Sequence, residues 1–164
     1  MRPELQILFE EPAFTIGLFE NALVWCFRGE VTLDRIKWAI PAHKQLVKKY
    51  PNGISVTTII AETVPLSMPA DARNLSTVIT KEHEPYYCCV SEVVPGTGFR
   101  AATVRSITAG IRIIARSKFP AKVFADVTTA ANWHAPLMSP HVPSKLVDPG
   151  DLGQAAERVR LGPS

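Results

Sequence analysis

The residue types best suited to chemistry lie close together near the middle of the chain. His83 and Glu84 are candidates for acid–base work, and Cys88 and Cys89 supply two thiols a few residues later. Nucleophilic catalysis needs a base within hydrogen-bond reach of the nucleophile and a third group that orients the base. Because His83 precedes Pro85 at a predicted helix end, a solvated side chain is the ordinary outcome there. We therefore expect no enzymatic use of these residues.

The three cysteines indicate free thiols rather than a disulfide framework. Their number is odd, and the adjacent Cys88 and Cys89 should point to opposite faces of a strand, which makes them a poor disulfide or metal chelate. Buried, reduced thiols are typical of a cytoplasmic protein. The four histidines have no spacing suited to metal ligation, and His43 falls on the apolar face of a predicted helix. We expect a core role for His43, and neither a metal nor a cofactor.

A short glycine turn is the other candidate site. Pro95-Gly-Thr-Gly98 lies between a predicted strand and a predicted helix, where free backbone N–H groups and the helix dipole are able to hold a phosphate or carboxylate. Gly-x-Gly alone is a weak signal, and neither a dinucleotide fingerprint nor a P-loop lysine follows it. A plain turn with Thr97 as the N-cap of the helix is the simpler interpretation.

The elements that position these residues alternate along the chain. Between residues 86 and 133 the order is strand, turn, apolar helix, strand and a short helix capped by Asp126, which predicts a βαβ crossover with parallel strands. A hairpin with its turn at Glu20-Asn21 comes earlier, followed by a helix that Thr32 should cap and Pro41 should kink or split. The predicted strands and helices cover residues 13–19, 22–27, 31–50, 54–60, 70–84, 86–94, 99–116, 121–125 and 126–133.

This order predicts a single α/β domain over residues 1–134. Its sheet should be mostly parallel, with about five strands and an N-terminal hairpin. Right-handed crossovers should place helices on both faces of the sheet. Residues 135–164 hold five of the 14 prolines and three of the nine glycines, so we expect a Pro/Gly-rich extended or disordered tail in which 151–161 is a candidate short helix.

Composition excludes several classes of partner. A net charge of +3 over 164 residues is too small to indicate nucleic-acid binding. No apolar run approaches the roughly 20 residues of a membrane span. The N-terminal apolar run is too short for a secretory signal and has acidic flanks. We expect a soluble, cytoplasmic protein.

The closing pattern Lys122-Val-Phe-Ala-Asp-Val-Thr-Thr-Ala-Ala-Asn-Trp133, together with the element order over 13–134, resembles the STAS and SpoIIAA-like families. The resemblance implies a small α/β domain without a cofactor that acts by binding other proteins, in some members through a phosphorylated serine. The family's Asp-Ser-Ser-Gly-like switch turn would fall at residues 61–69, where the motif is absent. Thr63 and Ser67 occupy that turn, so they are switch candidates by position alone.

Two further surfaces are candidates for partner contact. Trp38 lies off the main apolar stripe of its helix, so it is either a core residue or an exposed interface anchor. Arg105, Arg112 and Arg116 return to one face of the predicted 99–116 helix, as a solvated stripe or as a site for an acidic partner. The partner-binding or switch candidates are Thr63, Ser67, Asp71, Thr97 and Trp38.

The sequence therefore favours a non-enzymatic protein-interaction or regulatory module of STAS/SpoIIAA-like type. Its surface should comprise the loop 61–71 and neighbouring helix ends, and its partner is another protein or a second copy of the chain. The alternative is a small-ligand or lipid carrier with an apolar pocket between helices and sheet.

Overall fold

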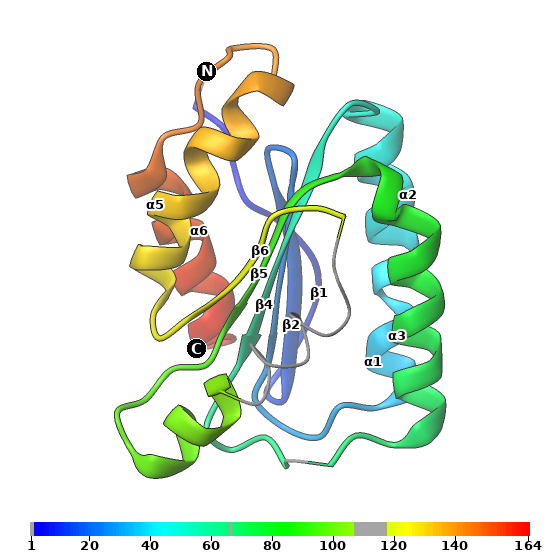
Figure 1. Ribbon diagram of the computed structural model, residues 1–164, viewed down its shortest axis with the longest axis vertical. Helices are drawn as coiled ribbons and strands as arrows, with labels where there is room; N and C mark the ends of the chain where they lie inside the picture. Colours follow the sequence, from blue (N-terminus) through cyan, green and yellow to red (C-terminus); the bar gives the residue numbers. More distant parts are fainter. Residues whose placement is uncertain (1, 66, 107–117) are drawn as a thin grey trace.

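The computed structural model describes residues 2–65, 67–106 and 118–164, and within these ranges six strands form one sheet (Figure 1). The strands lie in the sheet in the same order as in the chain. The first three pair antiparallel, and the third to the sixth pair parallel. They are β1 (Gln6–Glu11), β2 (Phe14–Phe19), β3 (Ala22–Phe27), β4 (Ile54–Ile60), β5 (Tyr87–Val93) and β6 (Ala121–Phe124).

Helices cover both faces of this sheet. Figure 1 shows α1, α2 and α3 on one face and α5 and α6 on the other. The helices are α1 (Leu33–Lys37), α2 (Ala39–Lys49), α3 (Ala70–His83), α5 (Val127–Met138) and α6 (Pro149–Leu161), with 3-10 turns at Glu84–Tyr86 and Ser139–His141. Residues 99–106 are also helical, and the rest of the predicted 99–116 helix lies outside the described residues.

The strand order explains which helices lie on which face. Each parallel strand is added on the far side of the previous one, so the chain always crosses the sheet in the same direction. Right-handed crossovers in one direction place their helices on one face, and the crossover helices α1 to α3 do share a face. Helices thus cover both faces as expected, although the crossover helices of the described residues, α1 to α3, all lie on one of them. The other face is covered by α5 and α6, which follow the last strand.

Residues 135–164, which the sequence predicted to be an extended or disordered tail, are part of the fold. The helix α5 runs past residue 134 to Met138, so the predicted domain boundary falls inside it. Asp148 caps α6 by accepting a hydrogen bond from the Asp151 backbone N–H at 2.9 Å, and Pro149 occupies the first turn, where a missing N–H costs nothing. The helix α6 buries Leu152, Ala155, Ala156 and Val159. Three of the prolines that suggested disorder lie in helical segments instead: Pro136 inside α5, Pro140 in the second 3-10 turn and Pro149 at the start of α6.

A sixth strand is the second correction. The strand β1 pairs antiparallel with β2 and carries a register irregularity between Ile7 and Phe9. Its residues are only partly buried, because β1 lies at the edge of the sheet. The run Gln6–Glu11 lacks the strict alternation that marks a half-buried strand, which explains why the sequence prediction of about five strands missed it.

The predicted 31–50 helix is divided as Pro41 suggested. Thr32 caps α1 by accepting a hydrogen bond from the Arg35 backbone N–H at 3.3 Å, as predicted. The helix breaks at Trp38, and α2 starts at Ala39. Pro41 then stands in the first turn of α2, where its missing N–H has no helical partner to lose.

An arginine fastens the C-terminal helix to the N-terminal strands. Arg28, directly after β3, donates to the Val159 carbonyl at 2.8 Å and the Arg160 carbonyl at 3.2 Å, at the end of α6. The same guanidinium donates to the Glu11 and Pro12 carbonyls between β1 and β2, both at 2.9 Å. The contacts with Val159 and Arg160 satisfy carbonyls at the end of the helix, which have no partner within the helix. Across the described residues, no helix has the length and apolarity to cross a membrane.

Candidate functional site

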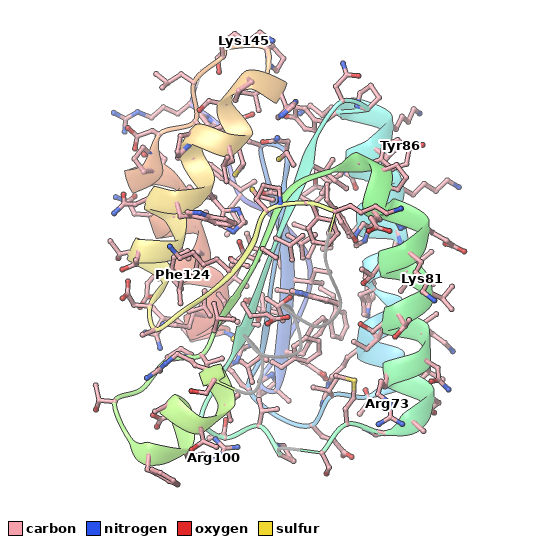
Figure 2. The ribbon with its side chains drawn as sticks, viewed as in Figure 1. Arg73, Lys81, Tyr86, Arg100, Phe124 and Lys145 are labelled. Atoms are coloured by element: carbon pink, nitrogen blue, oxygen red, sulfur yellow. The ribbon has the colours of Figure 1, made fainter. Side chains whose placement is uncertain are left out.

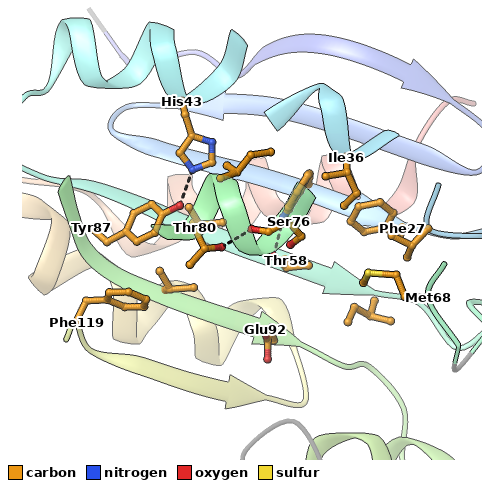
Figure 3. A pocket seen from close by; sticks show the side chains of 16 residues that line it. Phe27, Ile36, His43, Thr58, Met68, Ser76, Thr80, Tyr87, Glu92 and Phe119 are labelled. Carbon is orange, nitrogen blue, oxygen red and sulfur yellow. Dashed lines mark hydrogen bonds between the residues drawn. The ribbon is translucent and has the colours of Figure 1, made fainter. Parts of the chain in front are cut away.

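A cavity of about 170 Å³ lies between the sheet and the helices α1 to α3 (Figure 3). Side chains alternate between the two faces of a strand, and alternate residues from parts of β3, β4 and β5 point into it. The helices α1, α2 and α3, the loop before α3 and the segment before β6 complete the lining. The lining residues are Trp25, Phe27, Val31, Ile36, His43, Val56, Thr58, Ile60, Met68, Ser76, Ile79, Thr80, Tyr87, Val90, Glu92 and Phe119.

One polar corner of the cavity is formed by His43 and Tyr87, which Figure 3 shows facing each other. His43 Nδ1 lies 2.7 Å from the Ala39 carbonyl oxygen, and Nε2 lies 2.8 Å from the Tyr87 hydroxyl. A carbonyl oxygen only accepts, so Nδ1 carries the hydrogen and the Tyr87 hydroxyl donates to Nε2. Burial lowers the pKa of His43 to about 4, with a smaller contribution from nearby His83, so the ring is neutral at physiological pH.

Two further polar contacts tie cavity side chains to the protein. Trp25 Nε1 donates to Thr58 Oγ1 at 2.6 Å, which fixes the indole against the cavity wall. Thr80 Oγ1 donates to the Ser76 backbone carbonyl at 2.9 Å. Most of the other walls are aliphatic or aromatic. An apolar lining with a few oriented polar groups is typical of a small-molecule site.

A second candidate region lies where β4 and β5 end, and we call residues 61–65, 67–71 and 95–100 the carboxyl-edge surface. Arg100 donates to the Glu62 and Val64 carbonyls, which joins the two segments. Gly96 has a φ of +119°, and a Cβ there would overlap Glu62 Oε1, so this position requires glycine. Figure 2 places Arg100 at the same end of the molecule as Arg73, near the start of α3.

Four of the sequence-predicted candidates lie on this carboxyl-edge surface. Thr63 donates its hydroxyl to the Arg28 carbonyl. Asp71 Oδ1 accepts a hydrogen bond from the Ala72 backbone N–H at 2.7 Å. Ser67 and Thr97 are exposed. The fold thus gathers these residues at one end of the sheet, while their role in partner binding or switching stays a prediction.

The other predicted contact residues lie elsewhere. Trp38 is half-buried and stacks on Phe9, with ring centroids 4.8 Å apart. Arg105 donates to the Val94 and Gly96 carbonyls, both at 2.9 Å, so its guanidinium holds the end of β5. Arg112 and Arg116 lie outside the described residues.

Sequence reasoning missed a buried polar cluster on the opposite face, under α5. His134 is 1% exposed, and its Nδ1 lies 3.2 Å from Cys89 Sγ. Its Nε2 lies 2.6 Å from Ser91 Oγ and 3.2 Å from Thr57 Oγ1. Burial lowers the pKa of His134 to about 3, so the ring is neutral. A signal was present in the sequence, because polar side chains stand at alternate positions of otherwise apolar strands. Such side chains need a buried hydrogen-bond partner, and a histidine can provide it.

The adjacent thiols also differ from expectation. Ser55 pairs with Cys89 and Ile54 with Tyr87, so Cys88 is the extra residue of a β-bulge. The bulge turns Cys88 so that its Sγ lies 3.9 Å from Cys89 Sγ, rather than on the opposite face of the strand. Cys26, Cys88 and Cys89 are all free thiols.

No protein-family model matches the sequence, and no curated protein matches it. Among solved structures, the chain is similar to an uncharacterized DUF3478-family protein from Shewanella loihica PV-4 with a SpoIIAA-like fold. The likeness covers 80% of this chain and 93% of that one, at 14% sequence identity and a TM-score of 0.48. The likeness is one of fold and not of function.

Proposed function

We propose that the protein is a non-enzymatic regulatory or carrier module that binds a compact, largely apolar small molecule between the sheet and α1 to α3. The observation that carries this proposal is the cavity of about 170 Å³. The sequence favoured protein contact and kept a pocket as the alternative. The cavity lies between the helices and the sheet, where the carrier alternative expects a pocket, and this position favours ligand binding over protein contact.

The size of the cavity limits the ligand. An apolar cavity of about 150 Å³ is large enough for benzene. Sites for drug-sized ligands measure roughly 300–1,000 Å³. The cavity therefore suits a molecule of about one aromatic ring rather than an extended lipid chain.

The histidine of the cavity wall is better suited to binding than to catalysis. A general base needs a nitrogen or carboxylate that can take a proton from the substrate. Both ring nitrogens of His43 already have protein partners, and its lowered pKa makes it a weak base. The His43–Tyr87 pair instead provides a fixed polar corner that can orient a ligand hydroxyl or amide.

One residue connects the cavity with the carboxyl-edge surface. Met68 lines the cavity and is also 39% exposed, beside the exposed Ser67. Methionine adapts its shape to what it packs against. A bound molecule would therefore change the packing of Met68 and, through it, the loop that a protein partner would contact.

Titration with benzene and phenol, followed by amide NMR, tests this proposal. We expect saturable shifts confined to residues around the cavity, such as Val56, Ile79 and Val90. A Ser76→Leu substitution fills the cavity from α3 and should abolish the shifts. The matched control is Thr77→Leu, since Thr77 is on the exposed side of the same helix. Absence of saturation in the wild type, or equal binding by Ser76→Leu, would overturn the proposal.

A second function, contact with a protein partner, is favoured by Phe99. Its side chain is 89% exposed, at the point where Arg100 joins the two segments of the carboxyl-edge surface. Exposed aromatic side chains on ordered surfaces are frequent interface anchors. The Arg100 contacts hold the Phe99 backbone in place before any partner arrives.

Affinity capture with the full chain tests this second function. We expect a protein retained by the wild type and by Leu146→Ser, and lost with Phe99→Ser. Leu146 is the control because it is also strongly exposed but lies far along the chain, between α5 and α6. Identical retention by all three proteins, or retention of nothing specific, would contradict it.

A further inference from the structure

The two adjacent thiols of β5 form a pair with unequal surroundings. Cys88 is half-buried, whereas Cys89 is fully buried. The bulge at Cys88 brings the two sulfurs to 3.9 Å. Cys88 also lies beyond the β5–β6 ladder, because β6 pairs only from Val90 onward. An oxidant therefore reaches Cys88 more easily than Cys89.

A chain of hydrogen bonds points from the buried cluster toward Cys88. Ser91 Oγ can donate to His134 Nε2, His134 Nδ1 can then donate to Cys89 Sγ, and the Cys89 thiol can donate to Cys88 Sγ. A thiol that accepts a hydrogen bond is more easily ionised, and this contact lowers the pKa of Cys88. The same contact and burial raise the pKa of Cys89. Cys88 is thus the nucleophile of the pair, and Cys89 is the resolving thiol.

We propose that Cys88 and Cys89 form a reversible redox site that reacts with hydroperoxides. The Cys88 thiolate attacks the distal oxygen of the hydroperoxide, the O–O bond breaks, and an alkoxide or hydroxide leaves. The Cys88 sulfenic acid so formed is attacked by Cys89 sulfur, which forms the S–S bond and releases water, with the Cys89 proton completing that water. Sulfur loses two electrons overall, and the hydroperoxide is reduced to an alcohol or water.

The product should be easy to reduce. The Cα atoms of adjacent residues are about 3.8 Å apart, shorter than the roughly 4.4 Å minimum of relaxed disulfides. A strained disulfide has a higher reduction potential and is labile. Its formation also draws Cys89 Sγ away from His134, so the oxidised and reduced proteins differ inside the buried cluster. This site is separate from the cavity and does not depend on ligand binding.

Alkylation after treatment with hydrogen peroxide tests the proposal. The reduced full chain should take up three alkyl groups when denatured, matching its three cysteines. After peroxide it should take up one, at Cys26, with a mass loss of two hydrogens and a cross-linked Cys88–Cys89 peptide. A mild thiol reductant should restore all three. The imidazole NMR signals of His134 should shift on oxidation and return on reduction.

Three variants separate this mechanism from nonspecific oxidation. Cys88→Ser should slow thiol loss roughly tenfold or more, because the remaining thiols are buried. Cys89→Ser should stop at a sulfenic acid on Cys88 that dimedone traps, and the control Cys26→Ala should oxidise like the wild type. Three alkylated thiols after peroxide, a disulfide between chains, or irreversible Cys88 oxidation with Cys89 still free would each overturn the proposal.

Discussion

The two faces of the sheet are covered in different ways. Under α5 and α6, side chains such as Met138 and Val159 are fully buried, and the polar groups of the His134 cluster bond to each other. Under α1 to α3, a cavity of about 170 Å³ remains between helices and strands, and Ile40 and Val78 stay exposed on the outer sides of α2 and α3.

This difference separates stability from binding. A cavity costs stability because its lining loses packing contacts. Dense packing under α5 and α6 can offset that cost on the opposite face of the same sheet. We therefore expect substitutions under α5 and α6 to act on the free energy of unfolding, and substitutions around the cavity to act mainly on ligand binding.

The largest effect should come from a charge placed under α6. Val159→Asp buries a carboxylate without a partner and should lower the free energy of unfolding by about 3–5 kcal/mol. Gln154→Asp adds the same charge on the exposed side of α6 and should stay within about 0.5 kcal/mol of the wild type. Urea unfolding compares the two. Similar stabilities would mean that α6 is not part of the core.

A comparison of the two buried histidines should give the next largest effect. His134→Ala removes the centre of a dense polar cluster and leaves hydroxyls unpaired, which should cost about 2–4 kcal/mol. His43→Ala enlarges an existing cavity where water can reach Tyr87, and should cost about 1–2 kcal/mol. Thermal unfolding of both variants tests this order. A larger loss for His43→Ala would contradict the conclusion that the face under α5 and α6 contributes more to stability than the cavity face.

Lowering the pH should destabilise the fold, because both buried histidines are held neutral in it. Their pKa values in the fold are about 4 for His43 and about 3 for His134, against an ordinary value of 6.5. Below pH 6.5 the unfolded chain binds protons that the fold excludes, so the free energy of unfolding should decrease as the pH is lowered, with a slope that approaches about 1.4 kcal/mol per pH unit for each histidine. Urea unfolding between pH 6.5 and 5 avoids most carboxylate titration, and His134→Gln should halve the slope. A flat profile would show that neither ring is held neutral.

The smallest effect concerns added volume. Ala155→Leu overfills the space between α6 and its neighbours and should cost about 1–3 kcal/mol. Ser76→Leu places the same side chain toward the cavity and should change stability by less than about 1 kcal/mol. Midpoints of thermal unfolding are sufficient to rank the pair. Equal losses would show that the cavity cannot accept a side chain, and would count against a ligand there.

The sequence predicted local features well because local residues determine them. Thr32 and Asp126 cap the helices they were expected to cap, and the predicted strands near residues 54–60 and 121–125 are β4 and β6. The packing of α6 on the second face was missed because proline and glycine content was interpreted as disorder, whereas Pro149 starts a helix.

The site required information that spacing does not contain. His134 lies 45 residues from Cys89 and 77 from Thr57 along the chain, so only the folded sheet brings them together. The cavity likewise depends on the distance between the helices and the sheet, and the spacing of apolar residues in the sequence does not indicate that distance. The close approach of the Cys88 and Cys89 sulfurs depends on a β-bulge. A one-residue shift in strand pairing cannot be predicted from composition.

The Arg28 contact with the end of α6 has a consequence for folding kinetics. It joins residues 131 positions apart, among the most distant pairs in the chain. Such pairs form late, because closing a long loop costs entropy before any contact compensates for it. Until α6 docks, the face of β3 that contains Cys26 has no cover from that helix, so a folding intermediate should bind apolar dyes and aggregate more readily than the native state. Weakening the Arg28 contact would prolong that exposed state.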